Sequence, residues 1–254
     1  MGYVIAMAGK GGTGKTTIAA LIVRIIKEKQ LGSILAVDAD PNSNLAEALG
    51  LEAKETIGQI LDDISSHPEK IPAGMPKDRF IEYQLQTAIA EGEGFDVLTM
   101  GRPEGPGCYC YVNNALRNVM AKLIKDYDYV VIDNEAGLEH LSRRTTRSAD
   151  ALVVVSDASA VGLRAAKRIR DLVKELDIKT KKEFLIINCY AQDYAQDIEK
   201  EKIRSLGLDY LGFIPQDNQI EKISLNGNSL MDLKEDAPSL SALLRMGENI
   251  WQRN

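Results

Sequence analysis

The stretch Gly9–Thr17 reads G-K-G-G-T-G-K-T-T, and its residue types and spacing are those of a site for nucleotide phosphates. It fits the pattern G-x-x-x-x-G-K-[ST], in which glycines let successive backbone N–H groups turn inward around a phosphate. In that pattern Lys15 reaches the β- and γ-phosphates, and the Thr16 hydroxyl is a ligand of Mg²⁺. We therefore expect ATP or ADP to be bound by Gly11, Gly12, Thr13, Gly14, Lys15, Thr16 and Thr17.

The elements expected on either side of this loop suit that chemistry. The apolar run Tyr3–Ala8 predicts a buried parallel strand, and Thr17–Lys29 has the apolar spacing of a helix. A helix that begins at the loop adds the positive end of its dipole to the phosphate site. A Gly-rich turn without chemical function is the alternative, and this strand–loop–helix order argues against it.

Strand-like and helix-like segments alternate along the rest of the chain. Further strands are expected at 33–37, 95–100, 129–132, 151–155, 184–187 and 210–214. Helices are expected at 57–64, 78–90, 112–125, 161–176 and 240–251. This order predicts an α/β fold, with one domain over residues 1–254 and a mostly parallel, twisted sheet flanked by helices on both faces.

Composition excludes several other classes of protein. With 254 residues, 44% of them hydrophobic, the chain is long enough to bury a sizeable core. The net charge of −6 argues against a nucleic-acid-binding surface. We expect no membrane span, because no apolar run is long enough, and no signal peptide. Three cysteines do not make a disulfide framework, so we expect a cytoplasmic protein.

Carboxylates follow two of the expected strands. Asp38 and Asp40 come directly after the strand at 33–37, and Asp133 follows the strand at 129–132. Open α/β sheets bind ligands at the carboxyl ends of their strands, so we expect these groups beside the phosphate loop. Asp133 is then placed to hold the Mg²⁺ water shell, and Asp38 is a further candidate. The alternative for Asp38 and Asp40 is a role as turn or cap residues.

Cys108 and Cys110 are separated by one residue, between a Gly- and Pro-rich stretch and an expected helix. A disulfide between residues i and i+2 has poor geometry. A helix N-terminus lowers thiol pKa values and favours thiolates, the form that binds metals. Two thiolates leave a soft divalent ion such as Ni²⁺ or Zn²⁺ under-coordinated, and a symmetric dimer would supply four. Structural thiols are the alternative, and Cys189, after a strand, is expected to be a buried apolar residue.

The loop has an additional lysine, Lys10, directly after Gly9. With it, the sequence K-G-G-T-G-K-T-T resembles the deviant Walker A motif of the MinD, ParA, ArsA and nitrogenase-iron-protein group of ATPases. The resemblance implies a nucleotide-sandwich homodimer in which Lys10 touches the phosphates bound by the partner. It also implies that Asp40, supported by Asp38, lies near the attacking water of ATP hydrolysis. Contacts to adenine are implied for Asn188 and, more weakly, for Pro215 and Gln216.

The segment P-E-G-P-G-C-Y-C-Y, with D-N-E-A-G-L-E-H downstream, resembles the CooC/AcsF branch of this group. Those ATPases handle nickel and mature carbon monoxide dehydrogenase or acetyl-CoA synthase. The resemblance implies an ATP-dependent dimerising metallochaperone with one of those two enzymes as its client. His140, at the end of the second segment, is expected to have a structural or switch role rather than to bind metal. His67 is expected to be a solvated loop residue, because nothing in the sequence pairs with it.

Two other functions remain open at this stage. One is an iron–sulfur scaffold or reductase of the nitrogenase-iron-protein or Mrp type. The nitrogenase iron protein holds a [4Fe–4S] cluster with one cysteine before its switch II segment and one after it. This chain has Ala136 in the region where the second cysteine would be needed, which argues against such a cluster. The other is a MinD- or ParA-like ATPase that positions itself on membrane or DNA. Against this stand the acidic balance and the tail, which mixes Arg245 and Arg253 with Glu248 and is expected to pack on the core.

Overall fold

An eight-stranded sheet runs through the middle of the computed structural model, which describes residues 2–40, 42, 44–52, 55–101, 120–136, 148–190 and 200–253. The strand order is β3-β4-β2-β5-β1-β6-β7-β8, and all neighbours are parallel except β3 and β4. The strands are β1 (Tyr3–Gly9), β2 (Ile34–Ala39), β3 (Ala90–Gly92), β4 (Phe95–Thr99), β5 (Tyr129–Asn134), β6 (Ser148–Ser156), β7 (Lys179–Tyr190) and β8 (Asp209–Pro215). The expected α/β fold with a mostly parallel sheet is confirmed.

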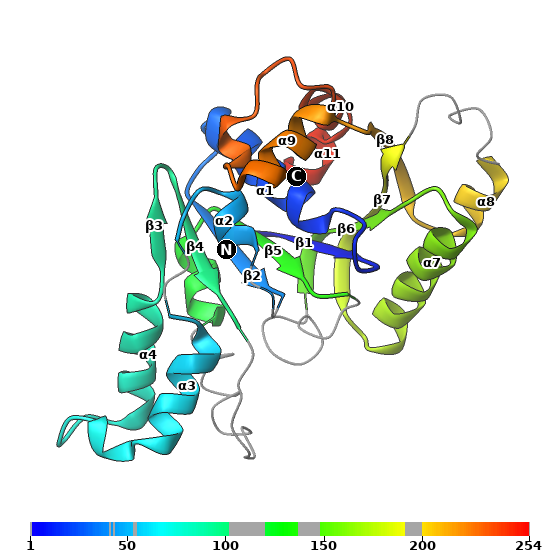
Figure 1. Cartoon of the computed structure of the whole chain (residues 1–254). Coiled ribbons are helices and arrows are strands. Elements are labelled where there is room, and N and C mark those ends of the chain that lie inside the picture. Colours follow the sequence, from blue (N-terminus) through cyan, green and yellow to red (C-terminus); the bar gives the residue numbers. More distant parts are fainter. Residues whose placement is uncertain are drawn as a thin grey trace.

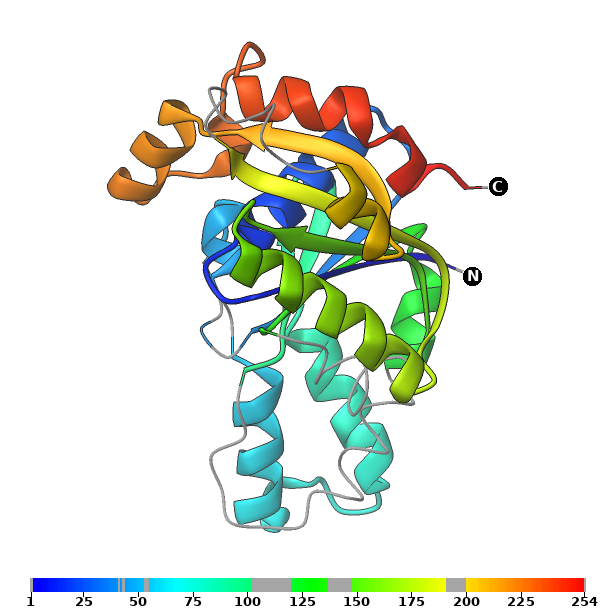
Figure 2. The same cartoon turned by 90° about the vertical axis from the view of Figure 1, so that its right-hand side faces the viewer.

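Helices cover both faces of this sheet, as Figures 1 and 2 show. The described helices are α1 (Lys15–Glu28), α2 (Leu45–Ala48), α3 (Ile57–Ser66), α4 (Lys77–Thr87), α7 (Ala160–Glu175), α8 (Lys200–Ser205), α9 (Asn218–Asn226), α10 (Pro238–Met246) and α11 (Glu248–Trp251), with the 3-10 turns η1 (Pro68–Lys70) and η3 (Leu230–Asp232). One face packs against α1, α2, α10 and α11. The other packs against α3, α4, α7 and residues 120–126, which are helical.

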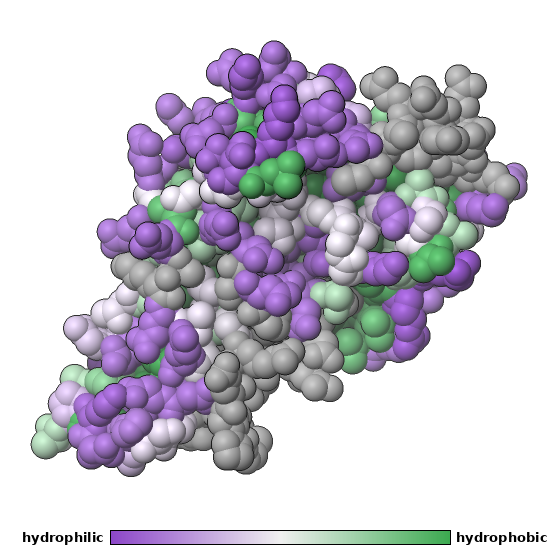
Figure 3. Space-filling view, in the orientation of Figure 1, coloured by the Kyte–Doolittle hydropathy of each residue, from purple (hydrophilic) through white to green (hydrophobic). Residues whose placement is uncertain are grey.

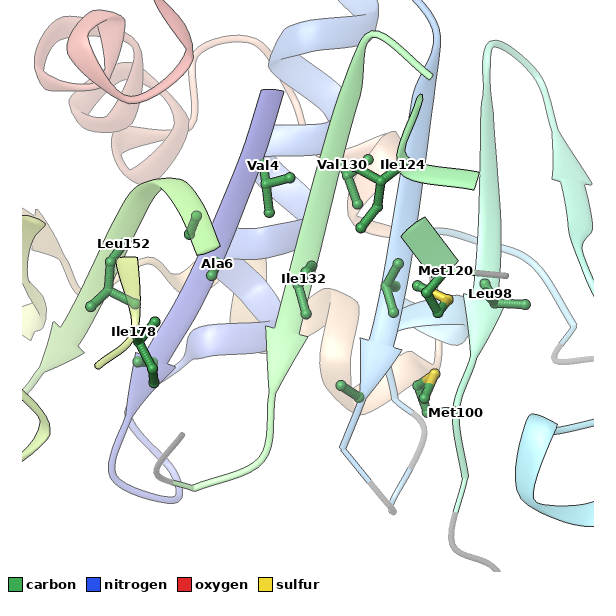
Figure 4. Close-up of a cluster of buried hydrophobic side chains, with 14 of the residues drawn as sticks. Val4, Ala6, Leu98, Met100, Met120, Ile124, Val130, Ile132, Leu152 and Ile178 are labelled. Carbon is green, nitrogen blue, oxygen red and sulfur yellow. The ribbon is translucent and has the colours of Figure 1, made fainter. Parts of the chain in front are cut away.

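The central strand explains why the sheet needs both layers. Along β1, Ile5 and Met7 point to the α1 side, while Val4, Ala6 and Ala8 point to the other side. Figure 4 shows Val4 and Ala6 on that second side, beside Val130 and Ile132 of β5. Because successive side chains of a strand alternate, a strand buried on both faces must be apolar throughout. This is why Tyr3–Ala8 is a continuous apolar run.

Several boundaries differ from those expected. The helix expected at 78–90 ends at Thr87, and residues 90–92 form the antiparallel strand β3. The reason is a tight hairpin: Gly92 pairs with Phe95, and Gly94 between them has φ +83°, which glycine adopts without strain. Helix α1 begins at Lys15, earlier than expected, because Gly14 in the left-handed region is its N-cap.

The C-terminal tail also differs in detail. The single helix expected at 240–251 is two helices, α10 and α11, which meet at Gly247. A Cβ at Gly247 would lie 2.4 Å from the Trp251 ring, so the chain turns tightly where only glycine fits. Leu243 and Ile250 are fully buried, so the tail packs on the core as expected. The upper part of the face shown in Figure 3 is mainly hydrophilic.

His67 is solvent-exposed, as expected, but it also has a neighbour that the sequence did not indicate. Its Nδ1 lies 3.0 Å from Asp63 Oδ1, and Lys70 Nζ lies 2.6 Å from the same oxygen. His67 is the C-cap of α3, so a carboxylate one helical turn earlier lies within reach of it. In the described part of the chain, no helix has the length and apolar character that a membrane span requires.

A buried arginine joins α1 to the C-terminal segment, and its removal should destabilise the fold. Arg24 is 4% exposed, and its guanidinium donates to the carbonyls of Leu230 and Leu233 while its Nε lies 2.6 Å from Glu28 Oε1. Arg24→Met keeps the apolar stem but leaves buried acceptors unpaired. We expect it to lower the free energy of unfolding by about 2–4 kcal/mol in urea titrations.

Lys27→Met on the same helix is the control. Lys27 pairs with Glu93, whose side chain is 96% exposed, so this change should cost less than about 1 kcal/mol. Equal unfolding midpoints for the two variants would show that the Arg24 contacts contribute little.

Candidate functional site

The phosphate loop lies between β1 and α1, at the carboxyl edge of the sheet. A Cβ added to Gly9 would lie 2.4 Å from the carbonyl oxygen of Val155 on β6, so the loop leaves the sheet where only glycine fits. Gly14 has φ +88°, and its carbonyl accepts the first helical bond, from Ile18 N–H. The loop therefore leads directly into a helix N-terminus, whose free N–H groups and dipole attract anions.

The two lysines of the loop have opposite settings. Lys15 is 6% exposed, and its Nζ donates to the carbonyl oxygen of Lys10 at 3.3 Å. The Lys10 side chain is exposed, and no hydrogen bond or ion pair is found for its ammonium among the described residues. Lys15 therefore adds its charge inside its own loop, whereas the charge of Lys10 faces outward.

Two buried carboxylates lie beside the loop, on neighbouring strands. Asp38 of β2 and Asp133 of β5 are in register with each other, and Met7 of β1 is in register with Asp133. Asp133 Oδ2 accepts a hydrogen bond from Thr16 Oγ1 at 2.5 Å, while Asp133 Oδ1 is buried and finds no partner within the described ranges. Asp38 accepts from the backbone N–H of Leu45 at 2.7 Å and of Asp40 at 3.2 Å.

Burial shifts the titration of both groups. It raises the pKa of Asp38 from 3.8 to about 7, although the backbone bond from Leu45 opposes the shift and the charge of Asp133 adds to it. Burial also raises the pKa of Asp133 from 3.8 to about 6, against the Thr16 hydrogen bond and the charge of Lys15. The site therefore holds negative charge that no described cation fully compensates, and it favours a bound positive ion.

Asp40 has a looser setting than Asp38. It is half-buried, and its Oδ1 accepts from the backbone N–H and side-chain amide of Asn42, at 2.9 and 3.0 Å. These are the contacts of a turn, which was the alternative reading for this residue. The structure places Asp40 at the same edge of the sheet as Asp38, and its role toward water stays a prediction.

The residues expected at the base lie at the ends of β7 and β8. Asn188 is 7% exposed, and its Nδ2 donates to the Thr13 carbonyl at 2.9 Å. Pro215 ends β8 and is in register with Tyr190. Gln216 is exposed and donates to Glu221 Oε1 at 2.7 Å. The three share the carboxyl edge of the sheet, and their contacts with adenine stay predictions.

The expected cysteine site lies outside the part of the chain that the structure describes. Cys108, Cys110 and His140 are outside the described residues, and Cys189 is in β7. Within the described ranges, no group of three or more His, Cys, Asp or Glu side chains is arranged to hold a metal ion. The nickel site therefore stays a prediction.

Comparison with known proteins agrees with this geometry. Residues 4–230 match the CobQ/CobB/MinD/ParA nucleotide binding domain. An uncharacterized ATP-binding protein of Methanocaldococcus jannaschii is 43% identical over 249 residues, which cover 97% of this chain and 98% of that protein. The chain belongs to the CobQ/CobB/MinD/ParA family.

Two further proteins are similar to this chain. The carbon monoxide dehydrogenase accessory protein CooC of Rhodospirillum rubrum is 30% identical over 257 residues, covering 94% of this chain and 95% of CooC. The septum site-determining protein MinD of Pyrococcus horikoshii, solved with Mg-ADP, has a TM-score of 0.71 at 23% identity. That alignment covers 98% of this chain and 96% of MinD, and it shows the shared fold. Membership makes the chain a P-loop ATPase-family protein whose expected ligands are ATP or ADP with Mg²⁺.

The residues at the loop fit the magnesium ion that this family implies. Asp133 Oδ1 is a buried oxygen without a donor among the described residues, and Thr16 Oγ1 lies beside the other oxygen of the same carboxylate. Hard cations such as Mg²⁺ take oxygen ligands of this kind, often through water. Thr16 and Asp133 would hold the ion, and Asp38 on the neighbouring strand β2 would add a further carboxylate to the site. When bound, the ion would offset the charge of the nucleotide phosphates.

Two polar residues of the site were not singled out from the sequence. Asn134 follows Asp133 and donates from Nδ2 to the Met7 carbonyl at 2.7 Å, which links β5 to β1 beside the loop. Asp217 is the N-cap of α9 and accepts from Ser239 Oγ at 2.6 Å. A capping signal was present for Asp217, since Asp before a helical run is a common N-cap. Nothing in the local sequence indicates the partner of Asn134.

The buried charge of Asp133 should cost stability when no ligand is bound. Burial raises the pKa of Asp133 from 3.8 to about 6. The stability that this group contributes is therefore fully present below pH 3.8 and is lost as pH rises through 6. Asp133→Asn has no charge to bury. The nucleotide-free variant should be more stable than wild type at pH 8 by about 1–3 kcal/mol, and by less at pH 5.

Urea unfolding at both pH values tests this, with the exposed Asp209→Asn as a control that should change little. The same Asp133 variant should bind ATP with Mg²⁺ more weakly. Equal stability of wild type and Asp133→Asn at pH 8 would show that burial of the ionised carboxylate does not destabilise the fold.

Proposed function

We propose that the protein is an ATP-dependent dimerising metallochaperone that binds nickel between subunits and assists nickel-site assembly in carbon monoxide dehydrogenase or acetyl-CoA synthase. Two observations support this. The chain is 30% identical to a protein named as a carbon monoxide dehydrogenase accessory protein, over nearly the whole of both chains. It also has the Cys108-Tyr109-Cys110 segment, which a positioning ATPase does not need. The thiolates of this segment require a reducing compartment such as the cytoplasm.

The observation that carries the ATPase part is the contrast between the two lysines. The buried Lys15 serves the phosphates of its own subunit, so a second cation in the same loop is redundant there. The exposed Lys10 is available to a second nucleotide. In the proposed dimer two chains face each other across their carboxyl edges, and each Lys10 reaches the phosphates of the partner. A two-fold axis makes both contacts equivalent.

Hydrolysis in this dimer would be assisted by Asp40. A carboxylate within hydrogen-bond reach of the attacking water can orient it and accept its proton. The contacts of Asp40 to Asn42 are local, and Asn42 is exposed. A small change in this turn would therefore free Asp40 for that role without disturbing the buried Asp38.

The metal part of the proposal follows from ligand count. One Cys-x-Cys segment supplies two thiolates, and soft divalent ions in closed sites usually take four ligands. Cys108 and Cys110 of both subunits would complete the set for Ni²⁺, or for Zn²⁺ in vitro. The ion is cargo for the client enzyme, so its affinity has to change during the ATPase cycle.

A hydrogen-bonded path supports such coupling. Met100 N–H donates to the Asp38 carbonyl at 2.8 Å, and Gly58 N–H donates to the Met100 carbonyl at 2.9 Å. Gly101 comes next, with φ +60°, and a Cβ there would lie 2.4 Å from Thr56 Oγ1. The chain that leads to Cys108 therefore starts from a residue bonded to the backbone of Asp38. In the proposed cycle, a movement of Asp38 on nucleotide binding would reach this start through the Met100 hydrogen bond.

The crossed-dimer proposal predicts different effects for the two lysines. Lys15→Ala should weaken ATP binding, because the charge inside the loop is lost. Lys10→Ala should bind ATP nearly as well as wild type but hydrolyse it about 100-fold more slowly, because a cation in the transition state is missing. Binding titrations and steady-state phosphate release measure the two effects separately.

Lys29→Ala, which removes an exposed lysine at the end of α1, is the control and should change neither. Wild-type hydrolysis by Lys10→Ala would rule out the crossed arrangement.

The metal proposal predicts one Ni²⁺ or Zn²⁺ ion per two chains. Cys108→Ser and Cys110→Ser should each collapse the affinity, because each removes half of the sulfur ligands from the dimer. Cys189→Ser is the matched control and should bind nearly as wild type does. The measurement is a metal titration under anaerobic, reducing conditions, with sedimentation to count subunits.

One ion per monomer, or binding that survives in the Cys108/Cys110 double variant, would place the metal elsewhere, and His140 would be tested next. Iron and acid-labile sulfide in the purified protein would support the iron–sulfur alternative instead.

A further inference from the structure

Asn188 and Asp133 hold the phosphate loop from the two flanks of β1, because β7 and β5 lie on opposite sides of that strand within the sheet. Asn188 lies near the C-terminal end of β7, two strands away from β1 in the sheet. Its Nδ2 donates to the carbonyl oxygen of Thr13 at 2.9 Å, and the residue is 7% exposed. A buried amide that bonds a loop carbonyl restrains that loop, because breaking the bond leaves polar atoms unpaired.

The other bonds within the loop do not tie it to the sheet. Thr13 N–H, Thr13 Oγ1 and Lys15 Nζ all donate to one acceptor, the Lys10 carbonyl, at 3.4, 2.9 and 3.3 Å. They join loop residues to one another. Among the described residues, side-chain hydrogen bonds connect the loop to other strands at two points, Thr16 to Asp133 and Asn188 to Thr13.

The position of Asn188 determines where one phosphate donor points. The peptide that joins Thr13 to Gly14 is planar and trans, so its N–H points away from its C=O. Because Asn188 holds the C=O, the Gly14 N–H faces away from Asn188. No hydrogen bond is found for this N–H among the described residues, so it is available to a phosphate oxygen.

The close approach of Asn188 also explains the residue at position 14. A Cβ on Gly14 would lie 2.2 Å from Asn188 Nδ2, and Gly14 has φ +88° at the N-cap of α1. Glycine is therefore needed here both for its backbone conformation and for the space that Asn188 takes. The amide thus packs directly on the turn that presents backbone N–H groups to the ligand.

We infer that Asn188 is a positioning residue for the phosphates: it sets the Thr13–Gly14 peptide so that the loop is preorganised for any triphosphate. The amide has two N–H donors and one is used by the loop, so this role is compatible with a contact to a base. The inference rests on nucleotide binding by the loop and is independent of the metal cargo. Its consequence is that Asn188 acts on ligands that have no adenine.

The test compares ligands with the same phosphates and different bases. Affinities of wild type and Asn188→Ala for ATP, GTP and inorganic tripolyphosphate are measured by calorimetry with Mg²⁺. A positioning residue should weaken all three by a similar factor, roughly 10-fold for one lost buried hydrogen bond. For a residue that contacts only the base, loss of the amide would weaken ATP, and also GTP where the contact is to N7, which both purines carry. It would leave tripolyphosphate unchanged, and that result would overturn the inference.

Two further variants complete the design. Asn188→Leu removes the donors but keeps the volume, and it should give the same pattern as Asn188→Ala, so a cavity effect is separated from the lost bond. Asn218→Ala, which changes an exposed asparagine at the start of α9, is the control and should leave all three affinities unchanged. Thermal unfolding without ligand identifies any variant that fails to fold.

Wild-type protein that bound none of the three ligands would overturn the assignment of the loop, and this inference with it. Weaker binding of GTP and tripolyphosphate by both Asn188 variants supports it, whatever the additional loss for ATP.

Discussion

The hydrogen bond between Thr16 and Asp133 is the contact on which the arrangement of the site depends. It joins the first turn of α1 to the carboxyl end of β5, residues that are 117 positions apart in the chain. The parallel register of β1, β2 and β5 makes it possible, because it brings Met7, Asp38 and Asp133 to the same level. One partner of this bond, Thr16, belongs to the phosphate loop, and the second buried carboxylate, Asp38, neighbours the other partner.

Burial of the two carboxylates at this level of the sheet is energetically unfavourable. Asp38 and Asp133 both have pKa values above the ordinary range of a carboxyl group because water is excluded from them. The unliganded fold therefore carries unfavourable charge at neutral pH, and a ligand that brings a cation relieves it. Binding to the native state alone stabilises that state by mass action. Nucleotide and magnesium should thus act on folding as well as on the chemistry of the site.

The sequence was most informative where one local pattern contains the whole signal. The strand at Tyr3–Ala8, the phosphate loop and the alternation of strands and helices each depend on adjacent residues, and the structure agrees with them. The hairpin at Gly92 and Phe95 was missed because three residues are too few to show a strand period. The bonds of Asn134 to Met7 and of Asn188 to Thr13 were missed for another reason. Each joins residues far apart in the chain, and only the strand order brings them together.

The two edges of the sheet bear on how such molecules associate. At one edge β3 has three residues and runs antiparallel to β4, and at the other β8 pairs with β7 through two register shifts. Short or irregular edge strands are poor templates for a strand from another molecule. Side-by-side growth into fibres or continuous sheets across molecules is therefore disfavoured. The proposed dimer would use neither of these edges, because it pairs the carboxyl ends of the strands, where Lys10 is exposed.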